Sequence, residues 1–314
     1  LEFHLTERTV RRFSLKIALA STSILAKPTL DLLGQNGGNI SKLFTKGGKP
    51  RGRGRDVLEN EISFLARESG IAIENAETSS DIAEVIRRDG IELVIAISYG
   101  KLLKKEALIA PTYGWLNLHF SKLPKFRGAA PVQRAILSGE NITGITVFKL
   151  DEGMDTGPIY LQTDFNLGSL NAGQALNEMS ILGASLIMET LKMIRQGKAP
   201  TPQSGVPSLA PKIEKSELRI KWTDESKTIN RQIRAFADAP GAWAEFRGKK
   251  LKILQARENN SSGLPGECLN VEPLIIGSGN GAIEVMKVQA ESSKRMTSTD
   301  WIRGARIIKG DIFH

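Results

Sequence analysis

The stretch IAIENAETSSDIAEVIRRDGIELVIAIS, residues 71–98, places a segment of helical periodicity between two short apolar runs. The runs IAIENA and IELVIAIS have the length of strands, whereas SSDIAEVIRRDG has apolar residues at helical spacing. Serine is a favoured helix N-cap and glycine commonly follows a helix end. The stretch therefore predicts a strand, a serine-capped helix and a second strand.

The same unit occurs earlier in the chain. LKIALAST (15–22) leads into the helical ILAKPTLDLLGQ, and the strand-like NISKLFT (39–45) precedes a helical DVLENEISFLARESG. This alternation predicts an α/β fold with a Rossmann-like, mostly parallel sheet covered by helices on both faces. Further strands are expected at 114–120, 145–150 and 157–165, and a long amphipathic helix at 172–195.

Composition changes at GKAPTPQSGVPSLAPK (197–212), which contains four prolines and two glycines. Short strands and the turns RGKK and GSGNG follow it, as in a small antiparallel barrel of the OB type. From Gly205 onward the sequence contains 18 basic and 13 acidic residues. This excess of positive charge is compatible with nucleic-acid binding or with a plain structural module. We expect an extension at 1–14, a catalytic domain at 15–196, a linker at 197–216 and a C-terminal domain at 217–314.

Bulk composition narrows the class of protein. The chain is 40% hydrophobic and 25% charged, and its longest apolar runs are strand-sized, so we expect no membrane span. One cysteine, Cys268, and three histidines argue against disulfides and against a metal site. The extension at 1–14 contains Glu2 and Glu7, unlike a transit peptide, and is expected to be a leader or tag remnant. A cytoplasmic monomer is expected.

The formal net charge is +9, and part of the positive charge is concentrated in one segment. NISKLFTKGGKPRGRGR (39–55) carries six basic residues and no acid. It is either a solvated surface loop or a contact for a polyanion.

The chemistry-bearing residues lie in GWLNLHF (114–120). Alternate side chains of a strand share a face, so Asn117 and His119 point into the same space. Asp155, in the turn LDEGMDTGP, lies at a sheet end, where parallel-sheet enzymes collect functional groups. A carboxylate that accepts one ring N–H would fix the tautomer of His119, and the other ring nitrogen could accept a proton. Asn117 is suited to stabilising an oxyanion.

Each of these residues also has a plainer interpretation. A lone histidine is often a satisfied core or surface residue, and aspartate beside glycine is common in turns. A serine hydrolase is excluded by the lack of a G-x-S-x-G elbow, and GRGR lacks the Lys-Ser/Thr of a P-loop. Attack of an amine on an acyl carbon fits the three residues best.

NLHFSKLPKFRGAAPVQRAI followed by GITVFKLDEGMDTGPI resembles the formyltransferases that use 10-formyltetrahydrofolate, most of all those acting on initiator methionyl-tRNA. The resemblance implies that Asn117, His119 and Asp155 are catalytic. It implies a folate-binding turn of Ser121, Lys122, Leu123 and Pro124, and tRNA contacts by Arg51, Arg53 and Arg55 in the basic loop. LAPKIEKSELRIKW and LPGECL resemble the linker and the OB-like C-terminal domain of that family.

The chain departs from the family pattern at two places. Ser21-Thr22-Ser23 replaces Gly-Thr-Pro after the first strand, which changes the backbone allowed there. Lys122 replaces a leucine. Two other functions stay open: formyl transfer to a small amine such as an amino sugar or a nucleotide precursor, and RNA binding without catalysis.

Overall fold

The computed structural model describes residues 15–46, 49–51, 56–237 and 239–314, with only the backbone described at 49–51 and 56–58. The extension at 1–14 lies outside the described residues. So do Arg53 and Arg55.

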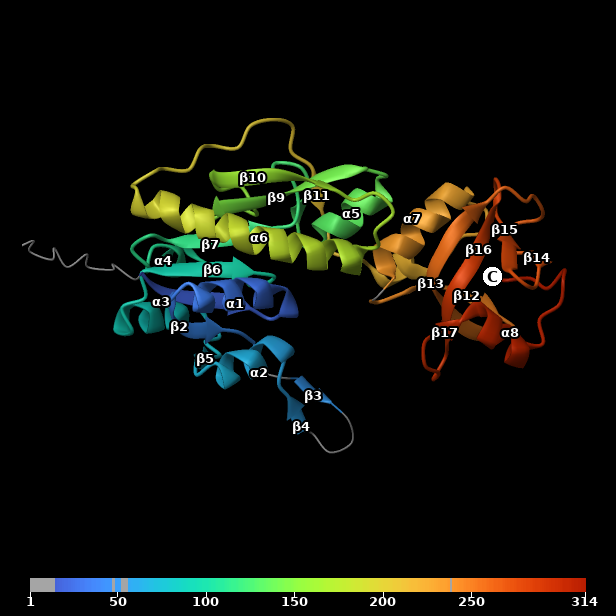
Figure 1. Ribbon diagram of the computed structural model, residues 1–314, viewed down its shortest axis with the longest axis horizontal. Helices are drawn as coiled ribbons and strands as arrows, with labels where there is room; N and C mark the ends of the chain where they lie inside the picture. Colours follow the sequence, from blue (N-terminus) through green and yellow to red (C-terminus); the bar gives the residue numbers. More distant parts are fainter. Residues whose placement is uncertain (1–14, 47–48, 52–55, 238) are drawn as a thin grey trace, which may run out of the picture. The chain divides into compact units, whose positions relative to one another are not determined.

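A seven-stranded sheet has the order β10-β9-β7-β6-β1-β2-β5 (Figure 1). Its strands are β1 (Lys16–Ser21), β2 (Asn39–Phe44), β5 (Ala72–Glu74), β6 (Leu93–Ile97), β7 (Trp115–His119), β9 (Ile142–Lys149) and β10 (Ile159–Asn166). The pairs β1–β2, β1–β6, β2–β5 and β6–β7 are parallel. The mostly parallel sheet expected from the strand–helix alternation is therefore confirmed.

Apolar burial explains the central strands. Every residue of β6, LVIAI, is buried, as a strand covered on both faces requires. Beside it, the fully buried Trp115 stacks on Tyr99 with ring centroids 6.4 Å apart and donates its indole N–H to the carbonyl oxygen of Ala107. The indole thus fills the core without leaving its polar group unsatisfied.

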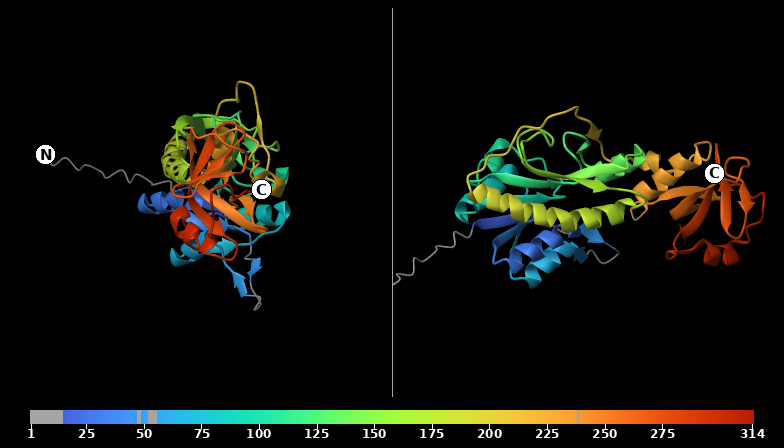
Figure 2. Two further views of the ribbon diagram at one scale, coloured as in Figure 1. Left: turned by 90° about the vertical axis from the view of Figure 1, so that its right-hand side faces the viewer. Right: turned by 45° about the horizontal axis from the view of Figure 1, so that its top comes forward.

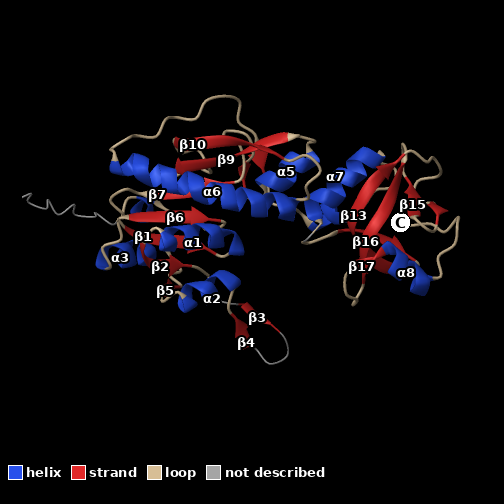
Figure 3. Cartoon of the chain, in the orientation of Figure 1, coloured by secondary structure: helices blue, strands red, loops and turns tan. Residues whose placement is uncertain are grey.

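Six α-helices accompany this sheet in the described part of the chain (Figure 3). They are α1 (Lys27–Gln35), which follows the short 3₁₀ helix η1 (Ile24–Ala26), α2 (Glu61–Glu68), α3 (Ser79–Arg88), α4 (Lys105–Leu108), α5 (Pro131–Leu137) and α6 (Ala172–Arg195). The long helix α6 has the predicted bounds.

The N-cap of α3 is Thr78, not a serine as predicted. The Thr78 hydroxyl accepts from the Asp81 backbone N–H at 3.1 Å, and the Asp81 carboxylate accepts from the Thr78 N–H at 2.9 Å. This reciprocal capping box satisfies two backbone donors at once. A cap at Ser79 or Ser80 would not give this exchange with Asp81.

The helix predicted from residue 56 begins later. Residues 56–58 form β4 (Asp56–Leu58), which pairs antiparallel with β3 (Lys49–Arg51). Asn60 then caps α2 by accepting from the Ser63 backbone N–H at 2.9 Å. The apolar Val57 and Leu58 fit a strand as well as a helix, so periodicity alone did not separate the two.

The C-terminal residues form an antiparallel sheet that curls into a half-barrel (Figure 2). Its order is β12-β13-β16-β15-β14, with β17 paired to β16. The elements are α7 (Ser226–Phe236), β12 (Ala242–Phe246), β13 (Lys249–Asn259), β14 (Cys268–Asn270), β15 (Leu274–Gly277), β16 (Ala282–Ala290), β17 (Met296–Thr297) and α8 (Ser298–Ala305). The small antiparallel barrel-like fold is thus confirmed.

The predicted turn RGKK is a two-residue hairpin. Arg247 and Gly248 join β12 to β13 with φ values of 49° and 73°. Two consecutive positive φ values are typical of the type I′ turn, whose twist matches that of the strands it joins.

The Pro-rich segment after α6 is bonded to the chain before it. Thr201 and Ile159 exchange backbone hydrogen bonds of 2.7 and 2.8 Å. Further on, β11 (Leu209–Ala210) pairs in parallel with β8 (Arg127–Gly128), and the 3₁₀ helix η2 (Lys215–Leu218) follows. The segment expected to be a semi-extended linker therefore contains its own strand.

Two compact units divide the chain. One comprises Leu1–Leu118, Phe148–Glu152 and Ala184–Pro200, and the other comprises His119–Val147, Gly153–Gly183 and Thr201–His314. None of the described helices has the length and apolar character needed to cross a bilayer.

Tyr99 makes the first unit sensitive to alkaline pH. Burial raises the pKa of Tyr99 to about 12, so the folded chain holds this proton more tightly than the unfolded chain does. The stabilisation is complete below about pH 10, the ordinary pKa of tyrosine, and is lost as the pH rises through the folded value.

We expect Tyr99→Phe to weaken the fall in unfolding free energy between about pH 10 and pH 12. Among the described residues the Tyr99 hydroxyl has no hydrogen-bond partner, so the substitution removes the ionisation and little else. Urea unfolding across this pH range measures the effect. An unchanged pH dependence would contradict the assignment.

Candidate active site

His119 ends β7 and is 6% exposed. Its Nε2 lies 2.9 Å from the carbonyl oxygen of Phe126, and its Nδ1 lies 3.8 Å from Oδ2 of Asp155. Because a carbonyl oxygen only accepts, Nε2 carries the ring proton and donates it to Phe126. In the neutral ring, Nδ1 therefore holds the lone pair, and this nitrogen faces the Asp155 carboxylate.

This geometry differs in one respect from the sequence expectation, which had Asp155 accept a ring N–H. The 3.8 Å separation exceeds the usual length of an N–H···O hydrogen bond, so the Phe126 carbonyl sets the tautomer instead. At this distance the carboxylate can act on the imidazole through its charge, without a hydrogen bond.

Asp155 is held in the left-handed region, with φ of 54°, which aspartate adopts more readily than most residues. Its Oδ2 accepts from the Gly128 backbone N–H at 2.8 Å. Gly128 itself has φ of 125°, and a Cβ there would lie 2.7 Å from the carbonyl oxygen of Ala210. Glycine is therefore required where β8 brings its N–H to the carboxylate.

Asn117 precedes His119 by two residues on β7, so the two side chains leave the same face of the strand. Asn117 is half-buried, whereas Leu116 and Leu118 on the opposite face are buried. The predicted alternation is present, and it gives the amide and the imidazole a common side.

The turn of Ser121, Lys122, Leu123 and Pro124 is held by bonds within the chain. The Thr146 hydroxyl donates to the Ser121 carbonyl oxygen at 2.7 Å, and the Gln162 amide donates to the Leu123 carbonyl oxygen at 2.9 Å. The Ser121 hydroxyl donates to the carbonyl oxygen of Lys125 at 2.6 Å. These bonds make the backbone of the turn rigid before any ligand arrives.

Lys122, one of the two departures from the family pattern, projects outward. Its Nζ lies 2.5 Å from Oδ1 of Asp164 on β10, and its side chain is 50% exposed. Such a surface ion pair contributes little stability. The lysine is accommodated without entering the core.

The other departure, Ser21-Thr22-Ser23, replaces lost backbone constraints with hydroxyl hydrogen bonds. The Ser23 hydroxyl accepts from the Leu25 N–H and so caps η1, and the Ser21 hydroxyl donates to the Ser23 carbonyl oxygen at 3.1 Å. Thr22 donates to the Ser98 carbonyl oxygen at 3.1 Å. The turn is therefore ordered despite its altered sequence.

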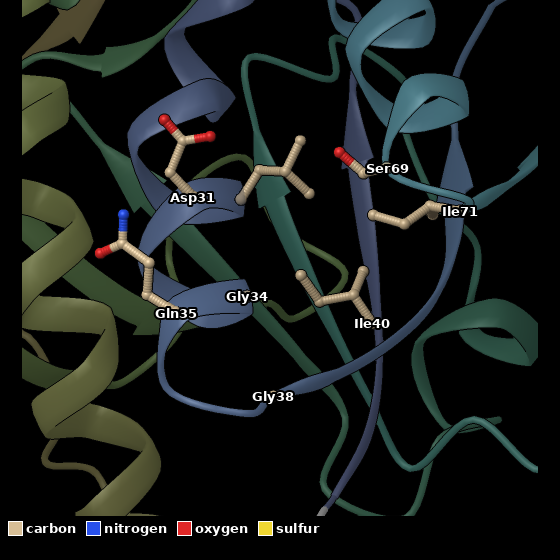
Figure 4. Close-up of a pocket in the computed structure, with 8 residues that line it drawn as sticks. Asp31, Gly34, Gln35, Gly38, Ile40, Ser69 and Ile71 are labelled. Carbon is tan, nitrogen blue, oxygen red and sulfur yellow. The ribbon is translucent and has the colours of Figure 1, made fainter.

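Of the arginines expected to contact tRNA, Arg51 is the last residue of β3. A pocket of about 370 Å³ lies elsewhere, between α1, the start of β2 and the segment that joins α2 to β5 (Figure 4). It is lined by Leu30, Asp31, Gly34, Gln35, Gly38, Ile40, Ser69 and Ile71. None of the expected site residues lines it. Within the described ranges no three His, Cys, Asp or Glu side chains gather as metal ligands would.

Several partners at the site were not found by sequence reasoning. The Phe126 carbonyl and the Gly128 N–H are backbone groups, which carry no residue-type signal. Thr146 and Gln162 lie on β9 and β10, and Gln203 lies in the predicted linker, where its amide donates to the carbonyl oxygens of Asp155 and Gly157. Strand pairing brings Thr146 and Gln162 to the motif, whereas Gln203 reaches it through its own hydrogen bonds.

A mostly parallel sheet with an imidazole beside a carboxylate at the end of a strand is the arrangement of an α/β enzyme that can use general acid–base chemistry. Comparison with known proteins specifies the class. A family model described as formyl transferase matches residues 15–177, and one described as formyl transferase, C-terminal domain, matches residues 212–306.

Two curated relatives agree over nearly the whole chain. Methionyl-tRNA formyltransferase of Streptomyces coelicolor is 36% identical over 95% of this chain and 99% of its own length. The same enzyme of Arthrobacter sp. is 35% identical over 95% of this chain and 100% of its own length. The chain belongs to the methionyl-tRNA formyltransferase family.

Solved structures share the fold. HypX from Aquifex aeolicus in complex with tetrahydrofolic acid has a TM-score of 0.69 at 20% identity, covering 96% of this chain and 51% of that one. An N-formyltransferase from Helicobacter canadensis, in complex with folinic acid and dTDP-3-aminofucose, has a TM-score of 0.65 at 19% identity, covering 88% and 99%. Methionyl-tRNA formyltransferase from Clostridium thermocellum has a TM-score of 0.58 at 17% identity, covering 90% and 99%.

Proposed function

We propose that this protein transfers the formyl group of 10-formyltetrahydrofolate to the α-amino group of methionine on initiator methionyl-tRNA. The near-full-length similarity to the Streptomyces and Arthrobacter enzymes carries the proposal. The arrangement of His119 and Asp155 supplies a mechanism for it.

In this mechanism the neutral α-amine of methionine attacks the formyl carbon, and a C–N bond forms. Nδ1 of His119 takes the proton that the nitrogen then sheds, and Asp155 stabilises the resulting imidazolium. The intermediate collapses as the bond from the formyl carbon to N10 of the folate breaks. The proton returns to N10, so tetrahydrofolate and formylmethionyl-tRNA leave with charge and atoms balanced.

The other predicted residues receive roles on the same basis. Asn117 shares a strand face with His119, and we assign its amide to the developing oxyanion. The turn of Ser121, Lys122, Leu123 and Pro124 is assigned to the folate. Its internal hydrogen bonds support this role, because a rigid turn loses little entropy when a flat ligand binds.

We assign tRNA binding to Arg51, Arg53 and Arg55 and to the basic residues of the C-terminal domain at 217–314, reached through the linker at 197–216. The excess of basic over acidic residues from Gly205 onward supports this assignment. We assign the catalytic domain to residues 15–196. We further propose that the protein acts as a monomer in the cytoplasm, where its single cysteine stays reduced.

Arg53→Ala is expected to weaken the binding of initiator tRNA, and the loss of affinity should be larger at low salt than at high salt. A lost phosphate contact should reduce the slope of log K against log salt concentration by about 0.7–0.9. Fluorescence anisotropy across a salt series measures both quantities. Lys198→Ala, an exposed cation after α6, is the matched control and should leave the slope unchanged. Equal effects of the two variants would show that only net charge matters.

A second candidate is formyl transfer to an amino sugar, favoured by the fold shared with the Helicobacter canadensis enzyme. The test supplies 10-formyltetrahydrofolate with either methionine-charged initiator tRNA or a dTDP-linked amino sugar. Formation of formylmethionyl-tRNA alone supports the first function. Product only on the sugar nucleotide supports the second.

A further inference from the structure

Residues 201–210 of the linker contact both loops that contact the His119 ring. One loop contains Phe126, whose backbone N–H donates to the Ser208 hydroxyl at 2.9 Å. The other contains Asp155, whose carbonyl oxygen accepts from the Gln203 amide at 2.8 Å. The linker is thus hydrogen-bonded to the partners of both ring nitrogens.

Gln203 uses all of its hydrogen-bonding groups in this arrangement. Its Nε2 donates to the carbonyl oxygens of Asp155 and Gly157, both at 2.8 Å. Its Oε1 accepts from Nη2 of Arg127 at 2.6 Å and from Nε of Arg127 at 3.2 Å. A half-buried amide with four hydrogen bonds is fully satisfied and has little freedom to move.

The backbone on either side of this amide needs such support. Asp155 has φ of 54° and Phe126 has φ of 59°, both in the left-handed region that non-glycine residues seldom adopt. Conformations of this kind persist when surrounding bonds over-determine them. Gln203 bonds directly to Asp155 and to Arg127, the residue that follows Phe126.

We propose that Gln203 is a positioning residue for the acid–base pair. It holds the Asp155 carboxylate opposite Nδ1 of His119 and, through Arg127, the Phe126 carbonyl against Nε2. The proposal rests on the proposed function for its kinetic consequence. Its structural consequence, a fixed environment for the imidazole, is independent of the substrate.

The test compares Gln203→Met with Gln232→Met. Methionine keeps the length of the side chain but neither donates nor accepts as the amide does. Gln232 is the matched control, because its amide also donates to two backbone carbonyl oxygens, those of Glu217 and Arg219, and it is also half-buried. Any general loss of stability from removing such an amide should appear in both variants.

We expect Gln203→Met to lower kcat for formylmethionyl-tRNA formation by about tenfold, with both KM values within about twofold, because it removes the two hydrogen bonds donated to Asp155 and Gly157 and the two accepted from Arg127. Gln232→Met should keep kcat. Gln203→Glu, assayed at pH 8, retains an acceptor for Arg127 but cannot donate to Asp155 and Gly157. Its kcat should therefore be lowered as much as that of Gln203→Met. Full kcat in Gln203→Glu would overturn the proposal.

A second readout, the NMR resonances of the His119 ring, needs no enzymatic activity. The chain has three histidines, and the ring resonances of His119 are identified by their loss in His119→Ala. They should shift in Gln203→Met and stay in place in Gln232→Met. Unshifted resonances in Gln203→Met would overturn the positioning role. If the wild-type protein forms no product while the His119 resonances still shift in Gln203→Met, only the proposed function is contradicted.

Discussion

His119→Ala is expected to lower kcat for formyl transfer by about 10²–10⁴-fold, the usual contribution of a positioned general acid–base group. The KM values for folate and charged tRNA should change far less, because the imidazole acts on a proton that leaves only as the C–N bond forms. Steady-state kinetics with each substrate varied in turn separates the two parameters.

The matched control is His314→Ala. His314 is exposed at the end of the chain and has no assigned role in the chemistry, so its removal should leave kcat unchanged. Circular dichroism of both variants checks that the buried position of His119 tolerates alanine. A rise in KM as large as the fall in kcat would contradict the acid–base role and indicate that His119 binds substrate.

Asp155→Asn is expected to lower kcat by about 10²–10³-fold, the range seen when one charge-stabilising group is removed. Asparagine is the appropriate replacement because it tolerates the left-handed backbone found at this position. It keeps the shape of the side chain but lacks the charge that stabilises the imidazolium 3.8 Å away.

Glu152→Gln, an exposed carboxylate three residues earlier, is the control and should retain kcat. If Asp155→Asn also retained kcat, the carboxylate would be a structural turn residue, as an aspartate beside glycines often is. A salt titration adds a further check: the largely buried pair of His119 and Asp155 should be screened weakly, so the defect should persist at high salt.

The features predictable from sequence are those set by local periodicity. β6 and β7 follow from apolar runs and alternation, and α6 from one sustained amphipathic pattern with a glycine after its end. The β12–β13 hairpin follows from a short turn between alternating runs. Each depends on residues close together in the chain, where spacing alone decides which faces are apolar.

Other features depend on which pairing partner a residue takes. Residues 56–58 are strand rather than helix because they pair with 49–51, and Thr78 caps α3 because Asp81 returns the hydrogen bond. Neither partner choice can be read from periodicity, since a short apolar run fits both structures and three adjacent hydroxyl residues offer the same cap chemistry.

The site shows the same division. Asn117 and His119 share a face by strand alternation, so their proximity was predictable. The tautomer of His119 was not, because its determinant is the backbone carbonyl of Phe126, seven residues along the chain. Gln203 lies in a segment whose composition suggested only a linker, and nothing in its local sequence indicates that its amide reaches Asp155.

The most direct test of the proposed function offers 10-formyltetrahydrofolate to the purified protein with three acceptors in parallel: methionine-charged initiator tRNA, methionine-charged elongator tRNA and free methionine. We predict formylmethionine on the initiator tRNA, with far less product on the other two. Product on none of the three, or equal product on free methionine, would contradict formylation of initiator methionyl-tRNA as the function of this protein.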